Sequence, residues 1–401
     1  MKVISTERIP IKIWATDLEE GALEQAKNLA NLPFAFHHIA IIADGHRGYG
    51  MPIGGVMATK GVVVPNAVGV DIGCGMVATK TSLTDIDTAT LKKIMGEIRK
   101  SVPVGFNKHK EAQSMMWMPT IGGSPAWNHH FDEDYPIVGI QYKNALKSVG
   151  TLGGGNHFIE IQKGSDNHIW IMIHSGSRNL GLQVAKYYND LAKKLVKKWH
   201  SSVDPKWDLA FLPLDSSEGK SYIREMEYCV EFALGNRKLM MDRICKIFNK
   251  ETHCVFSDYD NKNNGMINIA HNYAAMENYF GQNVMVHRKG ATRAYEGELG
   301  IIPGSQGTKS YIVRGKGNSD SFKSCSHGAG RLYSRKKCKE ELDLEAEKKI
   351  LDDQGIIHGI RNISDLDEAP SAYKNIDTVM SNQTDLVDIL VELTPLAVIK
   401  G

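Results

Sequence analysis

The chain has 401 residues, of which 42% are hydrophobic and 23% are charged, as in an ordinary globular protein with ample material for a core. Its 48 lysines and arginines nearly balance its 46 aspartates and glutamates, so the net charge of +2 excludes a polybasic nucleic-acid coat or an acidic tail. No apolar run approaches the roughly 18 residues of a membrane span. Glu7, Arg8 and Lys12 stand where a signal peptide needs an apolar centre. We therefore expect a soluble, cytoplasmic protein.

The predicted elements are mixed along the chain. A capping box at Thr16–Glu19 predicts a first helix that stops before Pro33. The spacing of apolar residues predicts further helices at 84–101, 182–199, 221–250, 342–354 and 384–393. Short runs rich in β-branched residues predict strands at 38–42, 61–64, 76–80, 158–162, 168–174, 266–269, 284–288 and 310–313.

These elements predict the fold class. Strands do not alternate regularly with helices, which disfavours a βα barrel and a doubly wound sheet. We expect one large α+β domain over residues 1–401, with mixed β-sheets flanked by helices. Residues 105–135 are expected to form a long excursion, which is either a substrate-side insertion or a packed loop. The lysine-rich face of the 182–199 helix is expected to be solvated.

Glycine is over-represented, with 38 of 401 residues against about 7% in an average protein. The glycines gather beside histidines and aspartates, at or just beyond the ends of predicted strands, in the segments 44–50, 69–75, 153–157, 174–178, 303–307 and 327–331. Glycine lets the backbone approach a ligand closely. Each cluster alone is typical of a tight turn, but six together indicate a functional site.

A metal site is predicted from five residues. The six cysteines include no CxxC pair and show no disulfide spacing, so each is a core residue, a ligand or a nucleophile. Asp71 and Cys74 share one glycine-rich turn, and three histidines each end a strand-like run: His157, His174 and His271. This donor set suits zinc or manganese, and one thiolate can bridge two ions.

A separate histidine has the surroundings of a nucleophile. His327 stands among small residues in Ser-His-Gly-Ala-Gly-Arg, and Asp44 is the candidate carboxylate that would hold its ring in one tautomer. The segment 303–310, PGSQGTKS, has the composition of an anion-binding nest, although it is not a P-loop. Six basic residues near these clusters predict a locally basic site: Arg178, Arg288, Lys289, Arg293, Lys309 and Arg331. The combination indicates phosphoryl or nucleotidyl transfer.

These strings together resemble the RtcB family of tRNA-splicing and RNA-repair ligases. The likeness runs from the Asp44 cluster through VGVDIGCG, GGGNHFIE, HSGSR, the His271-Asn272 pair, PGSQGTKS and HGAGR to the last residues, Val398-Ile-Lys-Gly401. It implies a GTP- and Mn²⁺-dependent ligase that joins an RNA 3′-phosphate or 2′,3′-cyclic phosphate to a 5′-hydroxyl. A histidine–GMP adduct and an RNA end activated by GMP are the implied intermediates. The resemblance also implies an archease-type protein as an activating partner.

The resemblance assigns roles residue by residue. Asp71, Cys74 and His157 would hold one Mn²⁺, and Cys74, His174 and His271 the other. His327 would be the nucleophile, Asp44 would orient it, and Arg178 would bind an RNA phosphate. The guanylate positions would be Asn156, His157, Phe158, Ile159, Glu160, His271, Asn272, Pro303, Gly304, Ser305, Gln306, Ser310, His327, Gly328, Ala329, Gly330 and Lys400.

Three positions depart from the pattern that many family members share. Gly45 stands where valine is common and is expected to loosen the turn that holds Asp44. Gln306 replaces a methionine and would add an amide to the guanylate pocket, and Asn179 replaces a glycine. None of the three removes a predicted metal ligand or the nucleophile.

Two other functions compete with the ligase. A dinuclear metallophosphoesterase would use the same five metal ligands, but it leaves His327, the PGSQG segment and Lys400 without a task. An RNA-binding or ribosome-associated factor with a vestigial site is disfavoured by the mild net charge.

Overall fold

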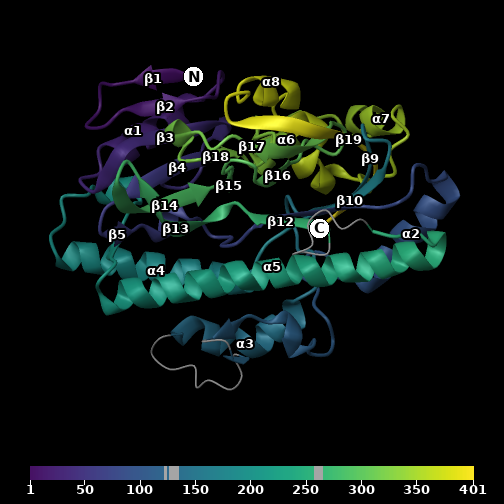
Figure 1. Ribbon diagram of the computed structural model, residues 1–401, viewed down its shortest axis with the longest axis horizontal. Helices are drawn as coiled ribbons and strands as arrows, with labels where there is room; N and C mark the ends of the chain where they lie inside the picture. The colour runs from purple at the N-terminus through teal and green to yellow at the C-terminus, as the bar shows by residue number, and fades with distance from the viewer. Residues whose placement is uncertain (122–123, 126–134, 257–264) are drawn as a thin grey trace.

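Two large sheets and one long helix dominate the computed structural model, which describes residues 1–121, 124–125, 135–256 and 265–401 (Figure 1). Side chains from both sheets, including Ala40, Val286 and Tyr311, share one buried cluster, so the sheets pack directly on each other. The 36-residue helix α5 (Ser217–Thr252) runs beneath them. Among the helices of these residues, none combines the length and the apolar character that crossing a membrane requires.

The first sheet is built around β3, whose residues 38–45 are all buried. Its six strands lie in the order β1-β2-β3-β4-β14-β13, and every pair is antiparallel except β2 with β3. The bounds are β1 (Lys2–Ile4), β2 (Ile11–Ile13), β3 (Ala35–His46), β4 (Ile53–Thr59), β13 (Asn272–Tyr279) and β14 (Gln282–Lys289).

The second sheet has seven antiparallel strands in the order β12-β6-β10-β9-β19-β17-β16. Strand β10 is buried along its whole length, because β6 and β9 flank it and α5 packs on it. The bounds are β6 (Gly75–Lys80), β9 (Phe158–Gly164), β10 (Ile169–Ser175), β12 (Met266–Ala270), β16 (Leu299–Ile302), β17 (Ser310–Gly315) and β19 (Val387–Lys400). Three short pairs complete the strands: β5 (Val62–Val63) with β11 (Leu212–Pro213), β7 (Thr120–Ile121) with β8 (Ser124–Pro125), and β15 (Ala291–Arg293) with β18 (Ser324–Ser326).

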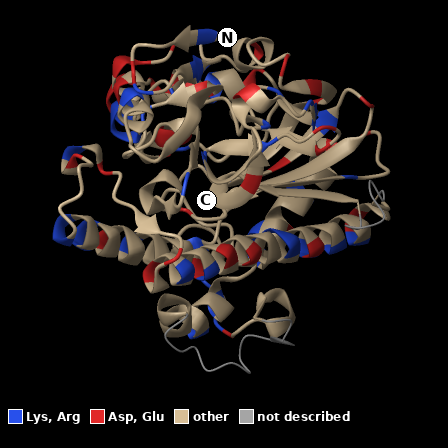
Figure 2. Ribbon diagram, turned by 60° about the vertical axis from the view of Figure 1, so that its left-hand side comes forward, with Lys and Arg blue, Asp and Glu red and all other residues tan. Residues whose placement is uncertain are grey.

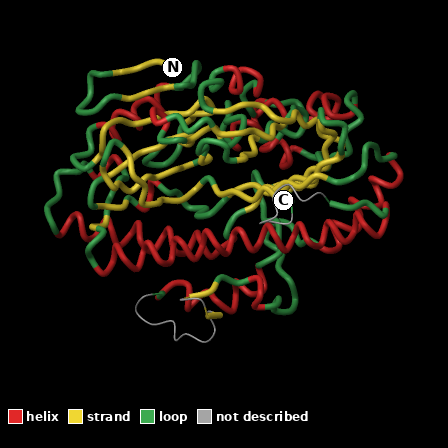
Figure 3. Tube along the Cα trace, in the orientation of Figure 1, coloured by secondary structure: helices red, strands yellow, loops and turns green. Residues whose placement is uncertain are grey.

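The longer helices form a layer below the strands, and α3 lies farthest from them (Figure 3). The α-helices are α1 (Glu20–Ala30), α2 (Thr88–Ser101), α3 (Pro136–Ser148), α4 (Arg178–Lys198), α5, α6 (Arg335–Glu341), α7 (Leu344–Asp352) and α8 (Ile376–Ser381). The α+β class and the mixed sheets flanked by helices are therefore confirmed. All eight predicted strands coincide with observed ones: β3, β5, β6, β9, β10, β12, β14 and β17.

The helix predicted at 384–393 is wrong, because most of this segment forms the first half of β19. Leucines and isoleucines three and four residues apart imitate a helical stripe, yet the backbone pairs with β17 on one side and β9 on the other. Pro395, which would break a helix, instead lies within this strand, beside a register shift.

Two helix starts also differ from the prediction. The Thr16–Glu19 capping box does not form: α1 begins at Glu20, and the Glu19 side chain instead accepts the backbone N–H of Arg47 at 2.7 Å. Helix α2 begins four residues later than predicted, because the Asp87 carboxylate caps it by accepting the N–H groups of Ala89 and Thr90. The segment 342–354 contains α7 as expected, while α6 was not predicted.

The basic face of α4 is solvated, as expected. Its lysines at 186, 193, 194, 197 and 198 are all exposed. Blue and red positions are interspersed along the long helices (Figure 2), and Lys193 pairs with Asp208 at 2.6 Å. This face therefore has the character of an ordinary water-facing helix surface.

The 105–135 excursion packs against the helical layer, although part of it, 122–123 and 126–134, lies outside the described residues. Helix α3 follows the excursion along the chain. A buried carboxylate from α5 accepts hydrogen bonds from the first N–H groups of α3. Glu225 Oε1 accepts the N–H of Ile137 at 2.7 Å and that of Val138 at 2.6 Å. Glu225 thus satisfies two donors that every helix N-terminus leaves unpaired.

We expect Glu225 to make stability depend on pH. Burial raises the pKa of its carboxyl to about 7, although the two N–H bonds oppose that rise. In the unfolded chain the group ionises near pH 4.5, so folding favours its protonated form. Relative to a Glu225→Gln variant, the wild type should lose stability as the pH rises from about 4.5 to about 7, by at most roughly 3 kcal/mol. Thermal unfolding of both proteins at pH 5 and pH 8 measures this, and parallel changes in the two would contradict it.

Candidate active site

Two strands bring His327 and Asp44 together. Asp44 lies in β3, and His327 directly follows β18. Asp44 Oδ2 accepts hydrogen bonds from His327 Nδ1 at 2.7 Å and from the backbone N–H groups of His327 at 3.1 Å and Gly328 at 3.3 Å. Burial raises the pKa of the Asp44 carboxyl, but the charge and hydrogen bonds of His327 outweigh burial and hold that pKa below its usual value. An ionised Asp44 keeps the imidazole proton on Nδ1, so Nε2 presents a lone pair.

Lys374 links the two segments that carry Asp44 and His327. Its Nζ donates to Gly45 O at 2.8 Å and to Asp17 Oδ1 at 2.7 Å, and its backbone N–H donates to Gly330 O at 2.9 Å. The lysine is buried. Sequence reasoning missed Lys374, because its partners lie 44 to more than 350 positions away and no local pattern marks it.

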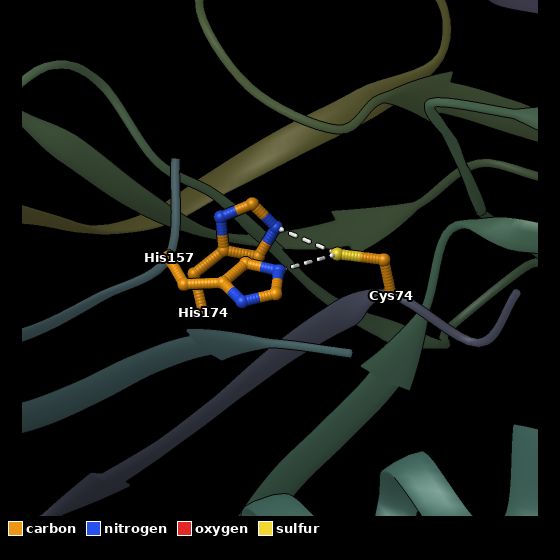
Figure 4. Close-up of side chains that lie close together, drawn as sticks. All are labelled: Cys74, His157 and His174. Carbon is orange, nitrogen blue, oxygen red and sulfur yellow. Dashed lines mark hydrogen bonds between the residues drawn. The ribbon is translucent and has the colours of Figure 1, made fainter. Parts of the chain in front are cut away.

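The five predicted metal ligands form one continuous cluster. Cys74 Sγ lies 3.4 Å from His157 Nε2 and 3.3 Å from His174 Nε2, with both rings facing the sulfur (Figure 4). These three residues are buried and offer ligand atoms within 4.8 Å of one another. Asp71 Oδ2 lies 3.1 Å from His157 Nε2, and His271 Nε2 lies 3.4 Å from His174 Nε2.

The hydrogen bonds around the cluster fit a bound cation. His157 Nδ1 donates to Leu152 O at 2.9 Å and His174 Nδ1 donates to Asn156 O at 3.1 Å, so each Nε2 carries a lone pair. Burial lowers the pKa of His174, which keeps this ring neutral, and burial together with Asp71 raises the pKa of the Cys74 thiol. Lone pairs that converge at such short range repel one another unless a cation lies between them. The donor set therefore suits one or two transition-metal ions.

A cavity of about 850 Å³ joins this cluster to the His327 pair. Most of the predicted guanylate residues line it: Asn156, Phe158, Glu160, His271, Asn272, Pro303, Gly304, Ser305, Gln306, His327, Gly328, Ala329, Gly330 and Lys400. Three do not. His157 belongs to the metal cluster, the Ile159 side chain lies in the core below β9, and Ser310 supports the loop by accepting the N–H of Gly304 at 3.1 Å.

A network of charged side chains lines the cavity around Lys400. Lys400 Nζ lies 3.9 Å from Glu368 Oε2 and 5.4 Å from the centre of the Phe158 ring. Glu368 also pairs with Arg331 and with Arg335, each at 3.1 Å. Burial lowers the pKa of Lys400, and the charge of Glu368 partly offsets that effect. Sequence reasoning missed Glu368, since it lies in an irregular segment without glycine or histidine.

Comparison with known proteins agrees with this arrangement. The family model described as tRNA-splicing ligase RtcB matches residues 25–401.

The chain belongs to the RtcB family.

Relatives in this family share almost the whole chain. The RNA-splicing ligase RtcB of Escherichia coli strain K12 is 37% identical over 410 residues, which cover 100% of this chain and 99% of the relative. The tRNA-splicing ligases RtcB of Nanoarchaeum equitans and Thermococcus kodakarensis are 31% and 29% identical, and each alignment covers 98% of this chain and 95% of the relative. The alignments thus span almost the whole of this RtcB-family chain and of relatives that are named as RNA ligases, which are enzymes.

Arg178 lies behind the metal cluster of this RtcB-family chain and does not line the large cavity. It opens α4 with a positive φ of 59°, and its guanidinium reaches Thr151 Oγ1 at 3.2 Å and Gly105 O at 3.4 Å. The expectation that six basic residues make the site basic is wrong for three of them: Arg288 is buried against Glu277, Arg293 pairs with Glu298 and Lys309 pairs with Glu392. Lys289 lies beside the cavity, where its ammonium donates to Tyr49 O and Asn66 O. Arg331 does line the cavity, with Arg47, Arg335, Lys337 and Lys400.

The three departures from the family pattern have definite places. A Cβ at Gly45 would lie 2.6 Å from Ile41 Cγ2, so a larger residue at this position requires the Ile41 side chain to shift. Gln306 donates its amide to Glu368 O at 2.6 Å. Asn179 faces α3, where its Nδ2 donates to Gln141 Oε1 at 3.3 Å.

Two buried residues of α5 support the metal cluster from below. Asn236 Oδ1 accepts the N–H groups of Gly150 and Thr151, and its Nδ2 donates to Gly176 O at 3.1 Å. Arg237 donates to Gly73 O at 2.9 Å and Ser175 O at 2.8 Å, the carbonyls adjacent to Cys74 and His174. Neither residue was singled out from the sequence, because a helix interior carries no motif of its own.

Replacing Arg237 with methionine should weaken metal binding about 10- to 100-fold, since the ligand loops lose their common anchor. Chelator competition followed by elemental analysis measures this affinity. The matched control is Lys238→Met on the exposed face of the same helix, which should bind metal like the wild type. Equal affinities for the two variants would show that Arg237 does not position the ligands.

Proposed function

We propose that this chain is a GTP- and Mn²⁺-dependent RNA ligase that joins RNA 3′-phosphate or 2′,3′-cyclic phosphate ends to 5′-hydroxyl ends. Its task would be tRNA splicing, RNA repair or both. The observation that carries the proposal is the placing of the His327–Asp44 pair and the Cys74 cluster on one cavity. A phosphoesterase needs only the cluster, whereas nucleotidyl transfer also needs a nucleophile with a fixed tautomer.

His327 would act first. Its Nε2 lone pair attacks the α-phosphorus of GTP, an N–P bond forms, and the bond to the β-phosphate oxygen breaks, so pyrophosphate leaves. Asp44 retains the Nδ1 proton and stabilises the positive charge that develops on the ring. An oxygen of the RNA 3′-phosphate then attacks the same phosphorus, GMP passes to the RNA end, and His327 returns to its neutral form.

The second transfer makes the phosphodiester bond. A 3′-phosphate is a poor electrophile, because it lacks a good leaving group. Once it carries GMP, the 5′-hydroxyl can attack it, GMP departs and the hydroxyl proton is lost to solvent or a base. Arg178, 3.5 Å from His157 Nδ1 through its Nη1, would hold an RNA phosphate next to the metal cluster.

The metal ligands would divide into two sets. Asp71, Cys74 and His157 would hold one ion, and Cys74, His174 and His271 the other. Bound Mn²⁺ would neutralise the charge that develops during each transfer and orient the attacking and leaving oxygens. The mixture of sulfur, nitrogen and oxygen donors favours Mn²⁺ over Mg²⁺, which prefers an all-oxygen octahedron.

The part of the cavity that Phe158 and Lys400 line would receive the guanylate. Phe158 offers a ring face, Lys400 a donor for a base oxygen, and the Pro303–Gln306 loop offers backbone groups to the phosphate. We assign the whole of 1–401 to one ligase domain. A cytoplasmic location belongs to the same proposal and is supported by six free cysteines. An archease-type activator would serve multiple turnover.

Covalent labelling tests the proposal. The purified protein is incubated with Mn²⁺ and GTP labelled at the α-phosphate, denatured and digested, and the labelled peptide is identified by mass spectrometry. The expected result is one acid-labile label on the peptide that contains His327. No label on a folded, metal-loaded protein that still hydrolyses cyclic phosphates would replace the ligase with the phosphoesterase.

A further inference from the structure

The loop between β3 and β4 exposes an aromatic side chain at the mouth of the active-site cavity. Tyr49 lines this cavity together with Arg47, yet 80% of its surface is exposed. Within the described residues the Tyr49 hydroxyl has no hydrogen-bond partner, so no hydrogen bond from this part of the chain holds the ring.

The loop itself is firmly held. Gln25 binds Gly48 twice, through its Nε2 to Gly48 O at 2.7 Å and through its Oε1 from the Gly48 N–H at 3.1 Å. The buried ammonium of Lys289 donates to Tyr49 O at 2.6 Å and to Asn66 O at 3.0 Å. The Tyr49 ring is therefore presented to solvent by an anchored backbone, which pre-organises it for binding.

Arg47 adds a positive charge to this surface. Its guanidinium lies over the first turn of α1, where a Cβ on Gly21 would be 3.1 Å from Arg47 Cδ. The Arg47 N–H is bound by Glu19, but its side chain is exposed and forms no ion pair with any described residue. An exposed aromatic ring beside an unpaired arginine is the combination that binds single-stranded nucleic acid by stacking and charge.

Lys289 connects this loop with the turn of the metal ligands and with His327. Lys289, which holds Tyr49, also lies 3.3 Å from the Cβ position of Gly69, two residues before Asp71. The next residue, Gly290, has its Cβ position 3.0 Å from His327 Cε1. Tyr49 and Arg47 therefore line the same cavity as most of the predicted metal ligands and His327, which is where an RNA end would have to arrive to react.

We propose that Tyr49 and Arg47 form a subsite for a single-stranded RNA end, in which Tyr49 stacks on a base and Arg47 binds a neighbouring phosphate. This inference rests on the proposed ligase function and extends it. The ligand chemistry is common to both strands that a ligase joins, so the experiment has to distinguish the strand with the 3′-phosphate from the strand with the 5′-hydroxyl.

Binding of two fluorescent oligoribonucleotides tests the subsite. One ends in a 3′-phosphate and the other begins with a 5′-hydroxyl, and fluorescence anisotropy is measured for the Mn²⁺-loaded wild type and variants. Tyr49→Ala should bind one of the two about tenfold more weakly, while Tyr49→Phe, which can still stack, should bind like the wild type. Arg47→Ala should make the affinity for the same strand less dependent on salt concentration, by about the amount that one phosphate contact contributes.

The control is Tyr187→Ala, which removes an exposed tyrosine from α4 and should change neither affinity. Thermal unfolding verifies that each variant is folded. If Tyr49→Ala binds both strands as tightly as the wild type, or if Tyr49→Phe binds as weakly as Tyr49→Ala, the stacking subsite is refuted. A wild type that binds neither strand and takes no label from GTP would instead refute the ligase function.

Discussion

Replacing His327 with alanine is expected to abolish both the covalent labelling by GTP and the joining of RNA ends. The imidazole Nε2 is the nucleophile that the geometry provides, and a methyl group cannot form the N–P bond. We expect a loss of at least about 10⁴-fold in joining, because residues that act as one catalytic unit fail together. Labelled GTP followed by denaturing electrophoresis measures the adduct, and a gel assay with two oligoribonucleotides measures joining.

Two comparisons make the His327 result specific. The variant should retain its metal ions, because the five metal ligands are intact. Asp44→Asn should keep the ring in place but lose its preferred tautomer, so labelling should slow by roughly 10²- to 10⁴-fold without disappearing. A His327→Ala protein that still seals RNA with GTP would show that the nucleophile lies elsewhere.

Replacing Cys74 with alanine should remove both metal ions together. Its sulfur is at similar distances from His157 Nε2 and His174 Nε2, 3.4 and 3.3 Å, and in the proposed arrangement both ions would share it. Loss of a shared thiolate leaves each ion with only two protein ligands. We expect less than about 0.1 metal equivalent per chain after dialysis and no detectable joining. Elemental analysis measures the metal content directly, independently of activity.

The matched control for Cys74 is Cys254→Ala. Cys254 is also buried, but it packs among apolar side chains at the end of α5 and binds no member of the cluster. This variant should keep both metal equivalents while losing some stability through the small cavity it creates. Retention of one full equivalent by Cys74→Ala would contradict the bridging role.

The sequence alone determined which residues we propose for the chemistry. Asp71, Cys74 and the three histidines stand beside glycines or at strand ends, and His327 stands among small residues, so their setting is written in local patterns. Strand β10 was equally readable, because a run of apolar β-branched residues between polar turns has few alternatives. The helix predicted at 384–393 shows the limit of such patterns: apolar spacing cannot tell a helical stripe from a strand buried between two neighbours.

Only the tertiary structure decided how these residues are held and what surrounds them. Lys374 ties Gly45 to Gly330, Arg237 ties Gly73 to Ser175, and Glu368 meets Lys400 at the end of the cavity. Each of these bonds joins segments that are far apart in the chain. Arg237, moreover, lies inside a long helix that carries no recognisable motif. Such contacts depend on strand order and helix packing, which arise from the collective burial of the core. A local motif cannot encode them, because the free energy that selects them belongs to the whole fold.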